Sequence, residues 1–238
     1  MSLSIIIPAY REAENLDVLL PQIKNEVHHL TKDSEILVID TMDPMDDTKS
    51  VCIKHQVGWI KRVDGNNFGD AIRTGIKNSK GNFLIVMDGD GSHDPEFIKS
   101  LWGKRHEGEI IIASRFMQGG SSDNPFILTL LSKILNFVFE LAAGTVVHDT
   151  SGGFRLYNGP HLRSLDLECN HFDIQQEMLV KMTHNDPKKV LEIPYHFKER
   201  MHGNSKRKFI RFAINYFRTI YRLRKYQSRA TSGAWTKR

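Results

Sequence analysis

The sequence predicts an α/β protein in which a mainly parallel central sheet lies between two layers of helices. Short apolar runs typical of buried strands lie at residues 4–8, 35–40, 82–88 and 109–113. Segments with apolar residues at helical spacing lie at residues 13–30, 47–55 and 69–77. Strands that alternate with helices in this way indicate a three-layer sandwich. Ligands of such sheets bind at the carboxyl ends of the strands, where the polar motifs of this sequence also fall.

The composition is that of an ordinary globular protein. The chain has 238 residues, of which 40% are hydrophobic and 26% charged, so it can form one large domain or two small ones. Its first strand follows the N-terminus without a basic stretch or cleavage site, so we expect no signal peptide. Cys52 and Cys169 have no metal-binding spacing. We therefore expect two inert thiols in a reducing, cytoplasmic setting.

Positive charge is concentrated at the C-terminal end. The formal net charge is +5, and residues 198–238 contain thirteen Lys or Arg but one acid, Glu199. Such a tail suits an anionic membrane face or nucleic acid, and no nucleic-acid recognition module accompanies it. Aromatic and aliphatic residues recur at helical spacing beside the basic ones, which is typical of an interfacial helix. We predict a first domain at 1–206 and a basic amphipathic helix and tail at 207–238, which lies on a membrane or packs on this domain or a partner.

A second apolar segment, at residues 126–147, fits two environments. Ser132, Lys133, Asn136 and Glu140 interrupt it. A spanning helix needs about 20 mostly apolar residues with few or no charges, so the segment is a poor transmembrane candidate. A helix that lies on the membrane surface and a helix packed in the core both fit.

The third apolar run ends in a pair of carboxylates, Asp88 and Asp90, with Gly89 between them. Two carboxylates separated by one small residue can face a single cation, and hard oxygen ligands suit Mg²⁺ or Mn²⁺ holding a diphosphate. Gly89 and Gly91 allow a ligand to approach the backbone closely. The alternative is an ordinary acidic turn, since Asp and Gly also populate turns.

The ends of the first two strands offer groups for a nucleoside. Pro8 and Ala9 are followed by Tyr10 and Glu12, which could stack on a base and hydrogen-bond a ribose. Asp40 ends the second strand and could make a similar contact. Glu12 has an alternative role, because an acid in the first turn of a helix interacts favourably with the helix dipole.

Taken in order, these motifs resemble those of the family-2 glycosyltransferases with a GT-A (Rossmann-like) fold, and most of all the dolichyl- or polyprenyl-phosphate sugar transferases. The matching pieces span residues 4–206 and lie at 5–16, 38–40, 44–48, 69–75, 88–90, 113–115, 119–120, 149–155, 176–178 and 192–206. Each motif is weak alone, and the ordered set is specific.

The resemblance implies a role for each matching residue. Those that would hold the nucleoside are Pro8, Ala9, Tyr10, Glu12 and Asp40. Those that would hold the diphosphate through Mg²⁺ or Mn²⁺ are Asp88, Gly89 and Asp90. Those that would contact phosphate groups of donor or acceptor are Arg115, Arg200 and Lys206, because cationic side chains suit that task.

The implied activity is metal-dependent, inverting transfer of a hexose from GDP-mannose or a UDP-sugar to a polyprenyl or dolichyl phosphate. A phosphate dianion could attack without a strong general base. We expect a peripheral enzyme on the cytoplasmic membrane face, with a separate membrane subunit or a second copy as possible partners. A hydroxyl acceptor would require a base, for which Asp149 is the candidate. A catalytically silent homologue is the other alternative.

The sequence also departs from the family pattern. Thr41 stands where another Asp is usual, Ser92 where a Gln is usual, and Arg11 where Asn is common. Residues 124–131 lack the arginines that usually grip the acceptor phosphate, which leaves Lys133 as the nearby cation. These departures bear on the acceptor more than on the donor.

Overall fold

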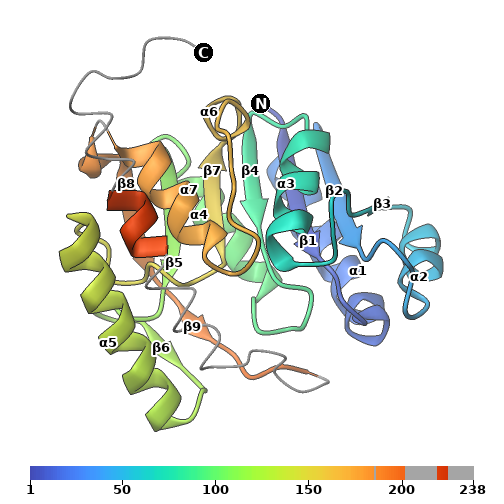
Figure 1. Cartoon of the computed structure of the whole chain (residues 1–238). Helices are drawn as coiled ribbons and strands as arrows, with labels where there is room; N and C mark the ends of the chain where they lie inside the picture. The colour runs from blue at the N-terminus through green and yellow to red at the C-terminus, as the bar shows by residue number, and fades with distance from the viewer. Residues whose placement is uncertain (185, 202–218, 225–238) are drawn as a thin grey trace.

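A computed structural model describes residues 1–184, 186–201 and 219–224. Its main sheet has seven strands in the order β3-β2-β1-β4-β7-β5-β8 (Figure 1). Neighbouring strands are parallel except for β7, which pairs antiparallel with β4 and β5. The predicted class, an α/β fold with a mainly parallel sheet, is therefore confirmed. The strands are β1 Leu3–Pro8, β2 Ser34–Asp40, β3 Gly58–Lys61, β4 Phe83–Val86, β5 Ile110–Ser114, β7 Arg155–Asn158 and β8 Val190–Pro194, while β6 Ser121–Ser122 and β9 His196–Phe197 form a small second sheet.

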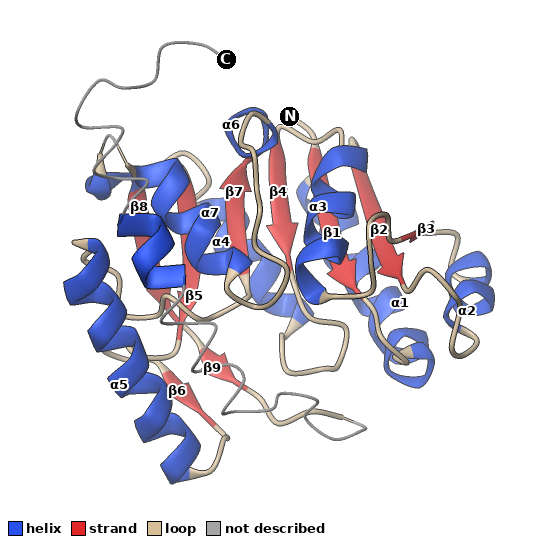
Figure 2. Ribbon diagram, in the orientation of Figure 1, coloured by secondary structure: helices blue, strands red, loops and turns tan. Residues whose placement is uncertain are grey.

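Helices cover both faces of the sheet, as Figure 2 shows. The α-helices are α1 Ala13–Leu30, α2 Thr48–Lys54, α3 Phe68–Asn78, α4 Ile98–Gly103, α5 Phe126–Ala143, α6 Gly159–Arg163 and α7 Ile174–Thr183, and the 3-10 helices are η1 Pro95–Phe97 and η2 Pro187–Lys189. Two apolar cores separate the layers. Ile5 and Ile7 of β1 face a core shared with α1, α2 and α4, whereas Ile6 faces a core shared with α3, α5, α6 and α7. This alternation along one strand is what a sheet buried on both faces requires.

The predicted strands correspond to β1, β2, β4 and β5, and the predicted helices to α1, α2 and α3. Three strands of the main sheet were missed for a physical reason. The edge strands β3 and β8 are only partly buried, and β7 has just two core residues, Leu156 and Tyr157, between the polar Arg155 and Asn158. None of them is a continuous apolar run, which is the pattern of a strand buried on both faces.

The apolar segment after residue 125 forms α5, and most of it is exposed. Asn136, Phe139 and Ala143 are its buried residues. Its exposed large apolar residues are Phe126, Ile127, Leu128, Leu130, Ile134, Phe137 and Leu141. A helix packed in the core therefore does not describe α5. Among the described residues, α5 is the one helix that is long and apolar enough to cross a membrane by length and composition alone, with a mean hydropathy of 1.8.

Of the predicted C-terminal helix and tail, the structure describes residues 219–224, which are helical. Thr219 and Leu223 are buried, and Ile220 packs against the core between α5 and α7, while Tyr221 is exposed. This short part of the tail thus packs on the domain. The rest of the tail lies outside the described residues, and its placement on a membrane stays a prediction.

Candidate functional site

A cavity of about 270 Å³ opens at the carboxyl edge of the sheet. It lies where β1 and β4 end, the position at which α/β sheets bind ligands. Its lining residues are Pro8, Tyr10, Glu12, Arg62, Asn66, Phe68, Asp88, Gly89, Asp90, Phe172 and Arg200. Seven predicted site residues, from three separate stretches of the sequence, therefore meet in one cavity: Pro8, Tyr10, Glu12, Asp88, Gly89, Asp90 and Arg200.

The two carboxylates after β4 have different surroundings. The Asp88 side chain is 20% exposed, whereas Asp90 is nearly buried. Oδ1 of Asp90 accepts hydrogen bonds from the backbone N–H of Ser92 at 3.0 Å and from its hydroxyl at 2.5 Å. Oδ2 lies 2.9 Å from Nη2 of Arg200. Burial alone would raise the pKa of Asp90, but the Ser92 hydroxyl and the Arg200 charge outweigh it and hold that pKa below its usual value.

The turn that carries these carboxylates is shaped by its neighbours. Gly91 has a φ of +88°, in the left-handed region that favours glycine, and the side chain of Met201 occupies the space that a Cβ would need. His93 accepts a hydrogen bond from the Asp88 N–H at 2.8 Å and stacks on Phe154 with ring centroids 4.8 Å apart. Since β4 and β7 bring His93 and Phe154 together, no local sequence pattern reveals this support.

The carboxylates of Asp88 and Asp90 fit a divalent cation whose remaining ligands come from a substrate. Within residues 1–184, 186–201 and 219–224, no group of three or more His, Cys, Asp or Glu side chains is arranged to hold a metal by itself. Mg²⁺ is usually bound through one or two carboxylates together with phosphate oxygens and water. Oδ2 of Asp90 already faces a cation, the Arg200 guanidinium, so the position is suited to positive charge.

The floor of the cavity beyond β1 is built from backbone and a buried arginine. Ala9 is fully buried and takes part through its carbonyl, which accepts a hydrogen bond from Arg62 Nη2. Arg62 also donates to the carbonyl of Asn66 at 2.7 Å. The Oδ1 atom of Asn66 accepts the N–H of Met42 at 2.8 Å, which fixes the orientation of its amide. Arg62 and Asn66 were missed by the sequence analysis, because they follow the unrecognised strand β3.

Arg11 has a φ of +57°. This left-handed backbone is tolerated by Asn better than by most residues. Arg11 stands where the resemblance leads us to expect Asn, and it adopts a backbone shape that Asn would tolerate more easily.

The structure does not bring Asp40 into the cavity. Its side chain is buried, and both carboxylate oxygens are engaged by the protein. Oδ1 accepts the N–H of Thr41 at 2.7 Å, and Oδ2 accepts Nε1 of Trp59 at 3.0 Å. Asp40 therefore joins β2 to the edge strand β3, and its position at a strand end did not reveal this structural task.

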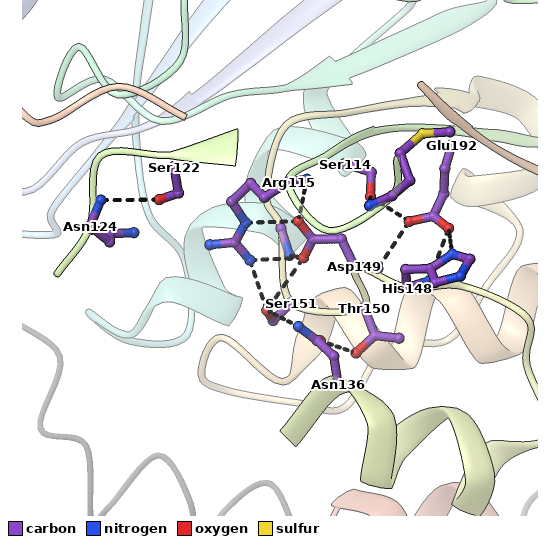
Figure 3. Close-up of polar contacts among 12 residues, drawn as sticks. Ser114, Arg115, Ser122, Asn124, Asn136, His148, Asp149, Thr150, Ser151 and Glu192 are labelled. Atoms are coloured by element: carbon purple, nitrogen blue, oxygen red, sulfur yellow. Dashed lines mark hydrogen bonds and ion pairs between the residues drawn. The ribbon is translucent and has the colours of Figure 1, made fainter. Parts of the chain in front are cut away.

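Arg115 also lies outside the cavity lining, in a buried ion pair with Asp149 (Figure 3). The guanidinium donates from Nε to Oδ2 at 2.7 Å and from Nη2 to Oδ1 at 2.8 Å, and the Arg115 N–H donates to Oδ2 at 3.0 Å. The Gly152 N–H donates to Oδ1 at 2.8 Å. Burial opposes ionisation of both side chains, but their mutual attraction outweighs it, so the pKa of Asp149 is lowered and that of Arg115 is raised.

A chain of hydrogen bonds connects this ion pair to α5. Ser151 Oγ accepts from Nη2 of Arg115 at 2.9 Å and from Nδ2 of Asn136 at 3.3 Å (Figure 3). The Thr150 hydroxyl donates to Oδ1 of Asn136 at 2.6 Å. Asn136 is the one polar residue among the three buried residues of α5, so these bonds fix one face of α5 against the loop that follows Asp149. The last predicted site residue, Lys206, lies outside the described residues.

Comparison with known proteins agrees with this geometry. Residues 4–165 match the family model described as glycosyl transferase family 2. A dolichol-phosphate mannosyltransferase of Pyrococcus furiosus is 32% identical over 95% of this chain and 65% of its own length, so the chain spans about two thirds of that relative. A polyprenol monophosphomannose synthase of Mycolicibacterium smegmatis is 31% identical over 85% of this chain and 79% of its own.

Solved structures show the same fold at lower identity. Glucosyl-3-phosphoglycerate synthase from Mycobacterium tuberculosis, in complex with Mn²⁺, uridine diphosphate and glucosyl-3-phosphoglycerate, matches with a TM-score of 0.70 and 15% identity over 95% of this chain and 79% of that one. The same enzyme with Mg²⁺ and uridine diphosphate matches with a TM-score of 0.69 and 16% identity over 92% of this chain and 76% of that one.

Proposed function

Because the chain belongs to glycosyltransferase family 2, we propose that it transfers a hexose from a nucleotide-sugar to a polyprenyl phosphate, with a divalent metal at Asp88 and Asp90. The observation that carries this proposal is the cavity at the carboxyl edge of the sheet. It brings Pro8 and Tyr10 into one space with the two carboxylates and Arg200. Groups suited to a nucleoside and groups suited to a diphosphate thus line the same cavity.

The donor would lie with its nucleoside near Pro8, Tyr10 and Glu12 and its diphosphate near Asp88, Asp90 and Arg200. The two relatives are named for mannose transfer, so GDP-mannose is the first donor to test, followed by UDP-sugars. A bound Mg²⁺ or Mn²⁺ would stabilise the negative charge of the departing nucleoside diphosphate. Arg200 would add a donor for phosphate oxygens at the same place, and Lys206 is proposed for the same task.

The surroundings of Asp149 support a phosphate acceptor over a hydroxyl acceptor. A hydroxyl acceptor would need a general base, and Asp149 was the candidate for it. The structure places this carboxylate in a fully buried site where four nitrogens donate to it and where its pKa is lowered. A phosphate dianion needs no such base, and its direct attack on the anomeric carbon predicts inversion. Arg115 would then support the acceptor site together with Lys133. Both cations lie over the Phe116 ring, with the guanidinium carbon of Arg115 at 4.8 Å and Nζ of Lys133 at 5.8 Å from its centre.

A lipid acceptor requires access to a membrane surface, and α5 offers an apolar face for it. Seven large apolar side chains of this helix are exposed, and its charged residues are Lys133 and Glu140. An amphipathic or apolar helix of this kind binds the interface of a bilayer, and the basic tail would add attraction to anionic lipids. We therefore propose a peripheral enzyme on the cytoplasmic membrane face, with α5 toward the lipid.

The proposal is tested by mixing the protein with Mn²⁺, a short-chain polyprenyl phosphate and radiolabelled GDP- or UDP-sugars. Label should enter the organic phase from one donor, and the Asp90→Ala variant should fail to transfer it. Binding of the unlabelled nucleoside diphosphate, measured by calorimetry with and without Mn²⁺, reports the metal site independently of turnover. Donor hydrolysis without transfer to any polyprenyl phosphate would contradict the proposed acceptor.

A further inference from the structure

The cavity has an aromatic wall that the motifs do not explain. Phe68, at the start of α3, and Phe172, in the loop before α7, both line the cavity. Their rings are stacked, with centroids 4.4 Å apart and an interplanar angle of 22°. A flat apolar surface of this kind suits the face of a nucleobase or the C–H face of a hexose. How strongly this surface can bind a ligand depends on whether the loop that carries Phe172 is held in place.

On one side this loop, residues 169–173, is attached to the beginning of α3. The Gly69 N–H donates to the carbonyl of Asn170 at 2.8 Å. Arg73 donates to the carbonyl of Cys169 at 2.5 Å and to Oδ1 of Asn170 at 2.9 Å. A Cβ on residue 69 would lie 2.2 Å from the Cys169 carbonyl oxygen, so the close approach requires glycine.

On the other side the same loop is attached to the C-terminal segment, residues 219–224. The Thr219 hydroxyl donates to Oδ2 of Asp173 at 2.6 Å, and both residues are buried. Arg222 donates to Sγ of Cys169, and its Nη2 lies 3.8 Å from Oδ2 of Asp173. Figure 1 shows this segment, in red, beside α7 and α5. Asp173 is the residue that directly follows Phe172, so the contact acts at the aromatic wall itself.

We propose that the C-terminal segment is a positioning element of the donor site, in which Thr219 and Arg222 hold the 169–173 loop so that Phe172 stacks on Phe68 and the pair contacts the nucleotide-sugar. This inference rests on the proposed function for the identity of the ligand. It assigns part of the predicted basic tail to donor binding instead of membrane contact. Residues about 130 positions away from the metal motif in the sequence thereby influence donor affinity.

The experiment measures binding of GDP and UDP, each with Mn²⁺, and of the active sugar nucleotide by calorimetry. Thr219→Val keeps the side-chain shape and removes the hydrogen bond to Asp173. We expect the Kd of the donor to rise about tenfold, the size expected for loss of one hydrogen bond to a charged group. Thr219→Ser should restore wild-type affinity, and the KM for polyprenyl phosphate should be unchanged in both variants.

Arg224→Ala is the matched control. Arg224 belongs to the same segment, but its Nε donates to the carbonyl of Ala142 in α5 at 2.7 Å and not to the 169–173 loop. Its substitution should leave donor affinity unchanged. If Thr219→Val does not fold, as judged by thermal unfolding, Phe172→Ala tests the wall directly, since Phe172 is only partly buried. A larger loss for the sugar nucleotide than for GDP or UDP places the sugar on the wall, and an equal loss places the nucleoside there.

Wild-type donor affinity in a folded Thr219→Val variant, or an equal loss in Arg224→Ala, would overturn the inference. Failure of the proposed function has a different signature. If the wild type binds a sugar nucleotide and Thr219→Val weakens that binding, but neither transfers sugar to a polyprenyl phosphate, the inference holds and the proposed acceptor is wrong. If the wild type binds no nucleotide with Mn²⁺, both are wrong.

Discussion

The buried pair Arg115–Asp149 allows the sharpest prediction about stability. Asp149 is fully buried and accepts hydrogen bonds from three nitrogens of Arg115 and from the Gly152 N–H. Asp149→Asn preserves the shape of the side chain but removes its charge, and it leaves one oxygen where two were used. The Arg115 guanidinium then stays buried without a counter-charge. Removing one partner of a buried pair in this way destabilises a protein by about 3–5 kcal/mol.

That loss is a large share of the roughly 5–15 kcal/mol by which a typical domain is stable. For a chain of this size, about 2–4 °C of Tm accompanies each kcal/mol, so the expected decrease in Tm is about 6–20 °C. Thermal and urea unfolding, followed by circular dichroism, measure both quantities. The matched control is Glu107→Gln, because its ion pair with Lys104 is about half exposed and should contribute less than about 1 kcal/mol. If Asp149→Asn unfolds within about 1 kcal/mol of the wild type, the buried pair does not stabilise the loop after α5.

Three further predictions concern pH, thiols and the exposed helix. Asp149 and Glu177 have lowered pKa values in the folded state, so the stability that they contribute is complete above their unfolded-state pKa values and is lost as the pH falls through their folded-state pKa values. Urea unfolding should show a constant free energy of unfolding down to about pH 4 and a decline below it, and a rise on acidification would contradict this. Burial raises the pKa of the Cys52 thiol to about 12, and Cys169 is buried too, so both thiols should resist a thiol reagent at pH 8 until urea is added. Rapid labelling of the folded protein would contradict the burial of these two side chains. The double substitution Ile127→Ser and Phe137→Ser removes two exposed apolar side chains of α5, each of which contributes about 1.5–3 kcal/mol when buried. Binding to anionic vesicles should therefore weaken at least about tenfold while Tm changes little, and unchanged sedimentation with vesicles would exclude α5 as the membrane face.

The main parts of the fold could be predicted because the central strands are buried on both faces. β1, β2, β4 and β5 therefore appear in the sequence as continuous apolar runs, and their order with the helices predicts a parallel sheet. β7 could not be found in this way, since it has only two adjacent core residues, Leu156 and Tyr157, and its antiparallel partners β4 and β5 lie far from it in the chain. The edge strands β3 and β8 carry too little apolar surface to stand out.

The candidate site was predicted where a strand end fixes the position of a side chain. Pro8, Tyr10, Asp88 and Asp90 follow the ends of β1 and β4, and the structure brings them together. Asp40 also ends a strand, but Trp59 of an unrecognised strand takes its carboxylate.

Residues that are positioned by tertiary contacts could not be predicted from the sequence. Phe172 reaches the cavity because its loop packs on α3 and on residues 219–224. Arg115 and Asp149 were each noticed, but their pairing depends on two loops that meet only in the folded chain.

The proposed acceptor, a lipid phosphate, can be tested by one comparison of two lipids. The protein would be given its active radiolabelled sugar nucleotide and Mn²⁺ with either a short-chain polyprenyl monophosphate or the corresponding polyprenol, which differs only by the phosphate. We predict transfer to the monophosphate with inversion at the anomeric carbon and no transfer to the alcohol, because the carboxylate of Asp149, the candidate base, is already engaged by Arg115. Equal transfer to the polyprenol, or transfer to a glycan hydroxyl alone, would contradict it.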